Sequence, residues 1–337
     1  MKLKHPFKYP ILIAGVILIF FTLFWGADFL VRFVTPTPKI DYGVTFSTVY
    51  SKELGLDPPV VFQAVLDDLG VKKVRLPIYW DSVEKEPGEF NFQDTDILLK
   101  QAEQRGAEVI LAIGYKVPRW PECFAPSWAK DLPKEQFQQQ ILQELAAAVD
   151  HYQNHPAVTA WQVENEPLLN FGLCRMFDKS FLESEVNLVR SKDSRPIVLT
   201  DSGELGLWVT ALQYSDIMGT SLYRTVWDPH IGYFNYPFPP LYYRLKANLT
   251  QRIFAPLSQG VMVSELQAEP WAPGKSITKI PLKEQIQFFS LDNLKGVVDF
   301  TTRTDIKSQY FWGVEWWYYM KLHNHPEYWE YAQTLIR

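Results

Sequence analysis

The chain has 337 residues, of which 47% are hydrophobic and 21% charged; this is the composition of an ordinary globular protein, and the length exceeds that of one small domain. The formal net charge of −5 is spread along the chain without a basic block, which argues against nucleic acid as a partner. Aromatic residues reach 15%, so we expect both a heavy aromatic core and rings exposed in a binding groove.

The N-terminal segment differs from the rest of the chain. Residues 1–8 carry three lysines, and residues 9–27 follow without a charge. As a helix this run would be about 28 Å long, close to the hydrocarbon thickness of a bilayer. A cleavable signal peptide usually has a shorter apolar stretch and small residues at its cleavage site, whereas Trp25 would stand three residues before the cut. The sequence therefore predicts an uncleaved transmembrane signal-anchor at residues 9–27, followed by a linker over residues 28–40.

The flanking charges set the expected orientation of this anchor. Lysines before the span favour a cytoplasmic N-terminus, so the remainder of the chain would lie outside the cytoplasm on a single-pass anchor in the cell membrane.

Strand-like and helix-like segments alternate from residue 41 to the end of the chain. Strands are expected where short apolar runs occur, and helices where apolar residues recur every three or four positions. The expected strands are 42–46, 71–80, 107–114, 157–167, 196–203, 216–223, 260–266 and 308–317. The expected helices are 58–70, 94–105, 132–155, 181–191, 205–214, 241–253, 282–302 and 326–336.

This alternation predicts the fold class. Eight short apolar strands joined by helices indicate a parallel α/β sheet, and eight repeats close naturally into a single (β/α)8 TIM barrel over residues 41–337. An open doubly wound sheet is the rival fold, but no glycine-rich phosphate loop follows the first strand. In such a barrel the active site lies at the carboxyl ends of the strands.

Two expected strands end in a carboxylate. Glu166 closes the fourth in WQVENEP, and Glu265 closes the seventh in GVMVSEL. Both side chains would point into the mouth of the barrel. Two carboxyl groups there can share a glycosidic bond, because one protonates the leaving oxygen while the other attacks the anomeric carbon.

The motif Asn165-Glu166-Pro167 after the fourth strand, together with Glu265 after the seventh, resembles the clan A glycoside hydrolases, especially family 5. The resemblance covers residues 41–337 as an architecture. It implies a retaining, cofactor-free glycosidase with Glu166 as acid/base and Glu265 as nucleophile.

The resemblance also implies binding roles for other residues. Asn165 would bond the sugar 2-hydroxyl, Arg75 would stand near the nucleophile, and Tyr223 would donate a hydrogen bond to it. Trp312 or its neighbour Trp316 would form the floor of the site for the cleaved sugar.

The sequence departs from many family 5 members at two places. Ser221 stands where a histidine is common on the sixth strand, and Gly114-Tyr115-Lys116 follows the third strand where another histidine is common. Both departures leave the carboxylate pair intact and leave the substrate undefined.

Some candidate residues have a simpler alternative role. Strand alternation gives Glu164 the same side as Glu166, and the Asn-Glu-Pro context favours Glu166. Glu269, beyond the seventh strand, would line a subsite or pair with a loop cation. Arg75 would also suit a buried ion pair. Trp120 and Trp271, on loops after strands three and seven, serve either as sugar platforms or in loop packing.

The chain contains two cysteines, Cys123 and Cys174, on neighbouring loops of the expected catalytic face. An exported protein can join them in a disulfide, and the alternative is two unrelated small buried residues. The histidines are scattered, and the pair His323 and His325 is expected in a loop rather than as metal ligands.

The sequence therefore predicts a membrane-anchored retaining glycoside hydrolase that acts on a poly- or oligosaccharide. Two alternatives stay open: a carbohydrate-binding barrel that does not turn over its ligand, and a transglycosylase that passes the glycosyl group to a sugar instead of water.

Overall fold

The computed structural model describes residues 8–34, 38–228, 230–272 and 276–337. Eight parallel strands form a closed barrel in the order β1-β12-β11-β8-β7-β6-β5-β2. Their bounds are β1 (Asp41–Thr45), β2 (Lys73–Pro77), β5 (Glu108–Ile113), β6 (Val158–Val163), β7 (Ile197–Asp201), β8 (Ile217–Leu222), β11 (Gly260–Gln267) and β12 (Ser308–Trp312). The predicted (β/α)8 barrel is confirmed.

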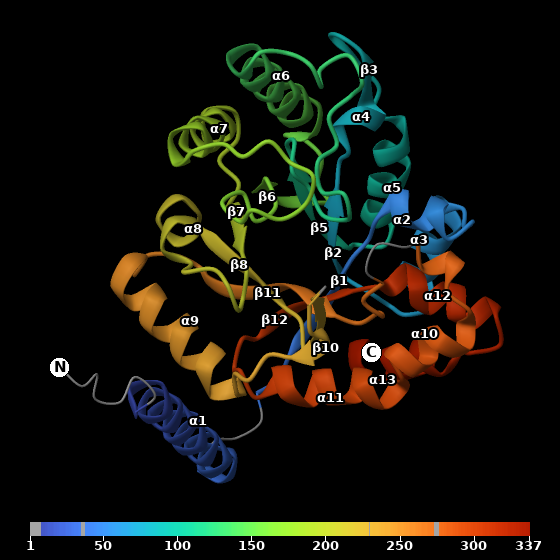
Figure 1. Ribbon diagram of the computed structural model, residues 1–337. Coiled ribbons are helices and arrows are strands. Elements are labelled where there is room, and N and C mark those ends of the chain that lie inside the picture. The colour runs from blue at the N-terminus through green and yellow to red at the C-terminus, as the bar shows by residue number, and fades with distance from the viewer. Residues whose placement is uncertain (1–7, 35–37, 229, 273–275) are drawn as a thin grey trace.

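Helices surround the barrel, as Figure 1 shows. They are α2 (Thr48–Glu53), α3 (Pro58–Asp67), α4 (Trp80–Val83), α5 (Gln93–Gln104), α6 (Lys134–Tyr152), α7 (Lys179–Lys192), α8 (Val209–Tyr214), α9 (Pro240–Phe254), α10 (Leu282–Phe288), α11 (Leu291–Thr302), α12 (Val314–Leu322) and α13 (Glu327–Ile336), with a 3-10 turn at Ile277–Lys279. Two hairpins extend from the barrel: β3 (Glu84–Glu86) with β4 (Glu89–Phe90), and β9 (Thr225–Asp228) with β10 (Gly232–Asn235).

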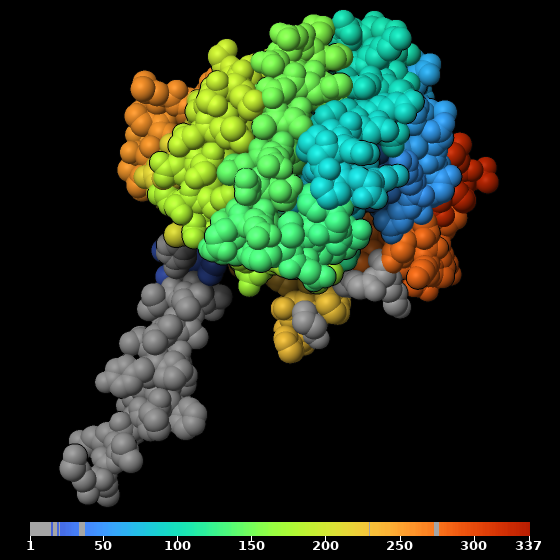
Figure 2. Space-filling view, turned by 90° about the horizontal axis from the view of Figure 1, so that it is seen from above, coloured from blue at the N-terminus to red at the C-terminus, as the bar shows by residue number. Residues whose placement is uncertain are grey.

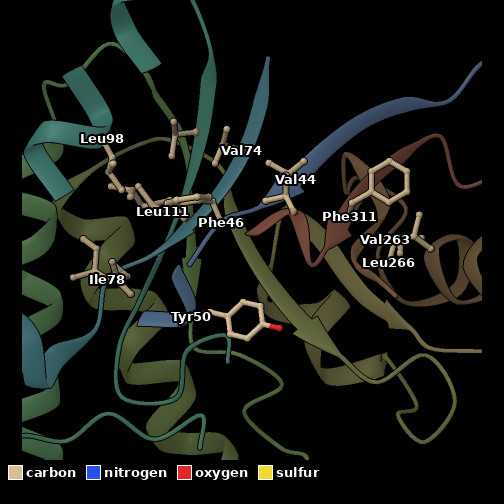
Figure 3. Close-up of a cluster of buried hydrophobic side chains, with 14 of the residues drawn as sticks. Val44, Phe46, Tyr50, Val74, Ile78, Leu98, Leu111, Val263, Leu266 and Phe311 are labelled. Carbon is tan, nitrogen blue, oxygen red and sulfur yellow. The ribbon is translucent and has the colours of Figure 1, made fainter. Parts of the chain in front are cut away.

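Alternation along the strands divides the core into two parts. One set of side chains, including Val44, Leu111 and Phe311, faces outward and packs with helical residues such as Leu98 (Figure 3). The other set fills the barrel interior as a separate buried cluster of Ile110, Ala160, Val198, Met262 and Tyr310.

The barrel interior becomes polar toward the carboxyl ends of its strands. Gln162, Thr200 and Ser264 each stand two residues beyond a member of the interior cluster, and all three are buried. Gln162 and Thr200 donate to Asn165, and Ser264 takes part through its backbone carbonyl, which accepts from Thr45 and Arg75. The Ser264 hydroxyl has no partner among the described residues. This layer forms the polar floor below the mouth.

One helix expected from the sequence is wrong. The segment 282–302 forms two helices, α10 and α11, instead of one. Ser290 and Asn293 make a reciprocal capping box that starts α11, and the extended backbone of Ser290 ends the preceding helix direction. The hydrophobic pattern continues through this break because both helices pack on the same core.

Helix α1 (Lys8–Val34) lies outside the barrel beside α9 (Figure 1). Trp25 Nε1 donates to the carbonyl of Pro237 at 2.9 Å, and the amide of Leu241 donates to Asp28 Oδ1 at 2.8 Å. Within the described ranges, no helix is long and apolar enough to cross a membrane, so the transmembrane anchor expected at residues 9–27 has no support from the structure. Residues 1–7 of the expected basic N-terminus lie outside the described ranges.

Cys123 and Cys174 form a disulfide, with their Cα atoms 5.2 Å apart. The bond joins the loop after β5 to the loop after β6, both at the carboxyl ends of the strands. It closes a loop with a sequence separation of 51 residues.

Replacing both cysteines with serine is expected to lower the free energy of unfolding by about 3–4 kcal/mol, because the unfolded chain regains the freedom of a long closed loop. Urea unfolding of the double variant beside the oxidised wild type measures the loss. Reduced wild type is the control, and a change below about 1 kcal/mol would contradict the expectation.

Candidate active site

Glu265 reaches the barrel mouth because of an irregularity in β11. Met262 fills the interior, so strict alternation would turn Ser264 inward and Glu265 outward toward the helices. The register with β8 shifts between Val263 and Glu265, and a bulge of this kind re-aims the side chain that follows it. Glu265 is therefore buried at the mouth, only 5% exposed, instead of packing against a helix.

Both carboxyl oxygens of Glu265 accept a hydrogen bond. Arg75 Nη1 lies 3.1 Å from Oε1, and the Tyr223 hydroxyl donates to Oε2 at 3.0 Å. Burial and then the charge of Glu265 raise the pKa of Tyr223 well above its ordinary value, so the phenol keeps its proton and donates it. The structure thus brings Arg75, Tyr223 and Glu265 together, as the family resemblance implies.

Arg75 connects this carboxylate to the end of β6. Its guanidinium is fully buried, and it donates to Asn165 Oδ1 and to Gln162 Oε1, both at 2.6 Å. The sequence left open whether Arg75 stands near the nucleophile or forms a buried ion pair. Both are true, because its ion-pair partner is Glu265. Removing either partner would leave a charge unpaired in the interior.

Asn165 is held so that one side of its amide stays available. Its Oδ1 accepts from Arg75, Gln162 and Thr200. Its Nδ2 is buried and has no partner among the described residues. An unpaired buried donor is costly unless a ligand completes it, so Nδ2 is available to donate to a ligand.

The turn after β6 separates the two neighbouring glutamates. Glu164 and Glu166 both have positive φ, at 57° and 44°. Glu164 points into the barrel wall, where its carboxylate accepts from the amides of Tyr115 and Lys116 at 2.7 and 2.6 Å. Gly114 permits this approach, because a Cβ there would lie 2.2 Å from Glu164 Oε1. Glu166 alone points to the mouth.

Glu166 lies in surroundings that favour its neutral form. Burial raises the pKa of Glu166 well above its ordinary value, and the negative charges of Glu265 and Glu122 raise it further. Ser221 Oγ donates to its Oε1 at 2.8 Å, which lowers the pKa by a smaller amount. Ser221 is also the register partner of Glu265 between β8 and β11, so the residue that bonds Glu166 stands next to Glu265.

Ser221, which departs from the family pattern, therefore contacts the residue that the resemblance implies as acid/base. Ser221→Ala is expected to raise the pKa of Glu166, because the variant loses a hydrogen bond to the ionised form. A general acid works only while protonated, so the alkaline limb of the pH profile of kcat/KM should move to higher pH.

The pH profile of kcat/KM on an aryl glycoside measures this effect. Ser215→Ala is the matched control, because that buried hydroxyl donates to the carbonyl of Ala211 and not to the site. An alkaline limb that moved to lower pH in Ser221→Ala would contradict the assigned contact.

Lys116 and Glu122 were not identified from the sequence. Lys116 Nζ donates to the carbonyls of Glu166 and Leu169, both at 2.9 Å, and lies 3.3 Å from Glu122 Oε2. Burial raises the pKa of Glu122 to about 8, against the lowering effect of Lys116. The one available signal was that Lys116 belongs to Gly114-Tyr115-Lys116, the segment after the third strand in which a histidine is common in family 5.

A second buried ion cluster borders the mouth beside Trp312. Arg119 pairs with Glu269 and with Glu315, and its guanidinium lies 4.2 Å from the centroid of the Trp312 ring. Tyr50 stacks on the guanidinium at 3.8 Å. Glu269 thus pairs with a loop cation, which was one of its two expected roles.

The expected tryptophans lie in different surroundings. Trp271 is half-buried with its ring 5.4 Å from Tyr223, and Trp120 is exposed on the rim, 6.0 Å from Phe171. Trp316 is not at the mouth: β12 ends at Trp312, and Trp316 lies fully buried on α12, where its Nε1 donates to Gln285 Oε1 at 2.8 Å. Its role as a sugar floor is therefore wrong.

The described part of the chain holds no cluster of three or more His, Cys, Asp or Glu side chains able to bind a metal ion. His323 and His325 bond instead to the carbonyl of Tyr319 and to Glu327.

Solved structures share this fold at low sequence identity. GH5_18 from Bifidobacterium longum superposes with a TM-score of 0.58 at 12% identity, covering 82% of this chain and 70% of that one. Endo-glycoceramidase II from Rhodococcus sp. gives 0.54 at 15%, covering 81% and 73%. GH5_18 from Streptomyces cattleya gives 0.54 at 13%, covering 82% and 71%. No curated protein sequence matches this chain.

The family model for cellulase, glycosyl hydrolase family 5, matches residues 45–228, which is more than half of the chain. The matched segment contains Arg75, Asn165, Glu166 and Tyr223. Glu265 lies outside it, on β11 of the same closed barrel. On this match and the barrel fold, the chain belongs to glycosyl hydrolase family 5 and is a glycosidase.

Proposed function

We propose that this glycosidase retains anomeric configuration and cleaves O-glycosidic bonds of a poly- or oligosaccharide by double displacement. The observation that carries the proposal is the contrast between two neighbouring carboxyl groups. Glu265 accepts from a cation and a phenol, whereas Glu166 has a raised pKa. Carboxyl groups in such different surroundings take the nucleophile and acid roles.

In the first step, Glu166 gives its proton to the glycosidic oxygen while a carboxylate oxygen of Glu265 attacks the anomeric carbon. The bond from the anomeric carbon to the leaving oxygen breaks, and a glycosyl ester forms on Glu265. Tyr223 and Arg75 hold the attacking carboxylate in place.

In the second step, ionised Glu166 accepts a proton from water while the water oxygen attacks the anomeric carbon. The Glu265 carboxylate leaves, and Glu166 regains the proton that it gave in the first step. Two inversions restore the original configuration. The Ser221 hydroxyl can donate to the ionised carboxylate of Glu166 during this step.

Asn165 and the rings of Trp312 and Trp271 provide the sugar contacts. The free Nδ2 of Asn165 supplies a donor on the residue that shares Arg75 with Glu265. The Trp271 ring lies against Tyr223, and a sugar bound over it would lie beside the nucleophile.

A panel of polysaccharides and aryl glycosides, followed by NMR of the first-formed anomer, tests this function. The proposal expects the anomer of the substrate in the first product, before mutarotation. Release of the opposite anomer would exclude double displacement, and no turnover of any panel member would favour a binding protein.

We also propose, from the sequence of residues 9–27 alone, that the chain is anchored in the cell membrane with its barrel outside the cytoplasm. The support is the uncharged run and the lysines before it.

Expressed with its native N-terminus, the chain is therefore expected in the membrane fraction after carbonate extraction, uncut. N-terminal sequencing is the measurement. A mature N-terminus near Asp28 in the soluble fraction would show a cleaved signal peptide instead.

A further inference from the structure

Exposed aliphatic side chains gather at the tips of loops around the barrel mouth. They lie on the loops that follow β6, β7 and β8, and we call them the apolar rim: Leu168, Leu173, Met176, Leu205, Leu207 and Ile231. Leu173 is 72% exposed, Leu207 80% and Ile231 68%. Figure 2 shows the β9–β10 hairpin, which carries Ile231 at its turn, projecting beyond the body of the barrel.

Sugar binding does not account for these side chains. Sugars stack on aromatic rings, and the rings of Trp271 and Tyr223 already lie beside Glu265. Leucine and isoleucine tips on separate loops offer no flat face to a sugar ring. Apolar residues scattered singly on a surface are ordinary, but here the loops after three successive barrel strands each carry such a side chain at the same mouth.

Two charged side chains of these loops are held by contacts with the protein. Arg175 lies between Leu173 and Met176, and its guanidinium donates to the backbone carbonyls of Leu132 and Lys130. Glu204 precedes Leu205, and its carboxyl accepts from the Tyr243 hydroxyl in a part-buried contact. At the hairpin turn, the carboxylate of Asp228 accepts from the amide of Ile231 at 3.3 Å, so this tip carries one charge beside its apolar side chain.

Helix α1 contacts the barrel on the same side. Phe21, Trp25 and Asp28 meet residues 237–241, at the end of α9 that is nearest to the mouth. The chain then has to reach the start of β1 on the opposite rim of the barrel. The N-terminal half of α1 therefore extends on the catalytic side, and residues 9–27 of that helix carry no charge.

We propose that the apolar rim docks on a lipid bilayer, so that the glycan reaching the mouth is one carried by a membrane-embedded amphiphile. The tips stand on separate loops around the mouth, so each enters a fluid acyl layer singly and the glutamates stay above the headgroups. A second protein copy would need a continuous complementary surface, whereas isolated tips offer none. The substrate half of the proposal rests on the proposed glycosidase function; the docking half does not.

Site-specific labelling tests the docking half without any turnover. Single cysteines at Leu207 and Ile231 are labelled with an environment-sensitive fluorophore in the full chain, since the native cysteines are already paired. The protein is bound to dioleoylphosphatidylcholine vesicles with or without doxyl-labelled lipid. Leu257 and Leu322, 97% and 56% exposed on the opposite rim, carry the control labels.

The expected result is a blue shift and a doxyl-dependent loss of emission at positions 207 and 231, with neither at 257 and 322. Chain that binds vesicles while labels 207 and 231 remain in water would overturn the proposal, as would chain that binds no vesicles. A blue shift that grows with protein concentration without lipid would show a second copy on the rim, and would also overturn it.

The substrate half is tested with one sugar presented in two ways. The soluble aryl glycoside that the wild type cleaves is compared with the octadecyl glycoside of the same sugar in the same vesicles. A variant with four rim residues replaced by serine should cleave the soluble aryl glycoside at the wild-type rate. It should cleave the octadecyl glycoside in vesicles more slowly, by on the order of tenfold or more. The replaced residues are Leu173, Leu205, Leu207 and Ile231. Serine at Val60, Ile97, Leu257 and Leu322 is the matched control.

An equal loss on both substrates, or no loss on either, would overturn the substrate half. If the wild type cleaves neither glycoside, the proposed glycosidase function fails. The labelling experiment needs no turnover, so it still shows whether the apolar rim enters the bilayer.

Discussion

Glu265→Gln is expected to lower kcat on an aryl glycoside by about 10⁴-fold or more. An amide cannot form the glycosyl ester, and it brings no negative charge to the developing cation on the sugar. The glutamine can still bond to Arg75 and Tyr223, but the buried charge of Arg75 loses its ion pair, so the fold of the variant is checked directly. Steady-state kinetics with circular dichroism of the same sample measures both properties.

Glu185→Gln is the matched control for this substitution. Burial and then the charge of Glu164 raise the pKa of Glu185 well above its ordinary value, so glutamine resembles the neutral acid already present. The side chain is buried on α7, which packs on α6, and its carboxyl lies beside Glu164 in the barrel wall and not beside Glu265. Activity of Glu265→Gln near that of Glu185→Gln would remove Glu265 as the nucleophile.

Azide adds a stereochemical readout to Glu265→Ala. In the space left by the carboxylate, azide can attack the anomeric carbon once, and a single displacement inverts its configuration. The expected product is a glycosyl azide of opposite anomeric configuration to the substrate. Identification by NMR distinguishes this product from background hydrolysis.

Glu166→Ala is expected to lower kcat by about 10²–10⁴-fold on substrates with poor leaving groups, because their oxygen departs only when protonated. An activated aryl group leaves without this help, so its glycosyl ester should form rapidly and then persist, since no base activates water. Burst kinetics measures this separation of the two steps. Azide should then attack the ester and give a glycosyl azide with the configuration of the substrate.

The two azide products check the assignment as a pair. Opposite configurations from Glu265→Ala and Glu166→Ala are expected, because the second variant still performs two displacements. The same configuration from both variants, or equal losses on good and poor leaving groups in Glu166→Ala, would contradict the separate roles. Ser215→Ala again serves as the unaffected comparison.

The barrel was predictable from the sequence because each strand is a short apolar run between helices. Parallel strands covered on both faces need such runs, and the spacing of Asn165-Glu166-Pro167 and Glu265 then placed both carboxylates at the mouth. The hydrophobic pattern did not predict features in which the backbone changes direction but the spacing of apolar residues continues. The start of α11 after Ser290 is one such feature.

The segment between β8 and α9 contains another feature that was not predicted from the sequence. Residues 225–228 pair with 232–235 as a hairpin, where no strand was expected from the sequence. The alternation of exposed and buried residues along its strands is too short to be recognised reliably.

The electrostatic part of the site depends on contacts between residues that are distant in sequence. The sequence cannot show that the bulge in β11 turns Glu265 to the mouth, or that Ser221 lies 55 residues from Glu166 and yet bonds to it. Glu164 and Glu166 looked equivalent by alternation, and only the turn after Val163 separates them.

Location of a trapped sugar is the most direct test of the central claim that Glu265 is the nucleophile of a retaining enzyme. A 2-deoxy-2-fluoro glycoside of a sugar that the wild type cleaves slows both steps and lets the ester accumulate. After peptic digestion, mass spectrometry should find the adduct on Glu265, within the peptide that contains β11. An adduct on Glu122 or Glu269, or an inverted product with no adduct, would contradict the account.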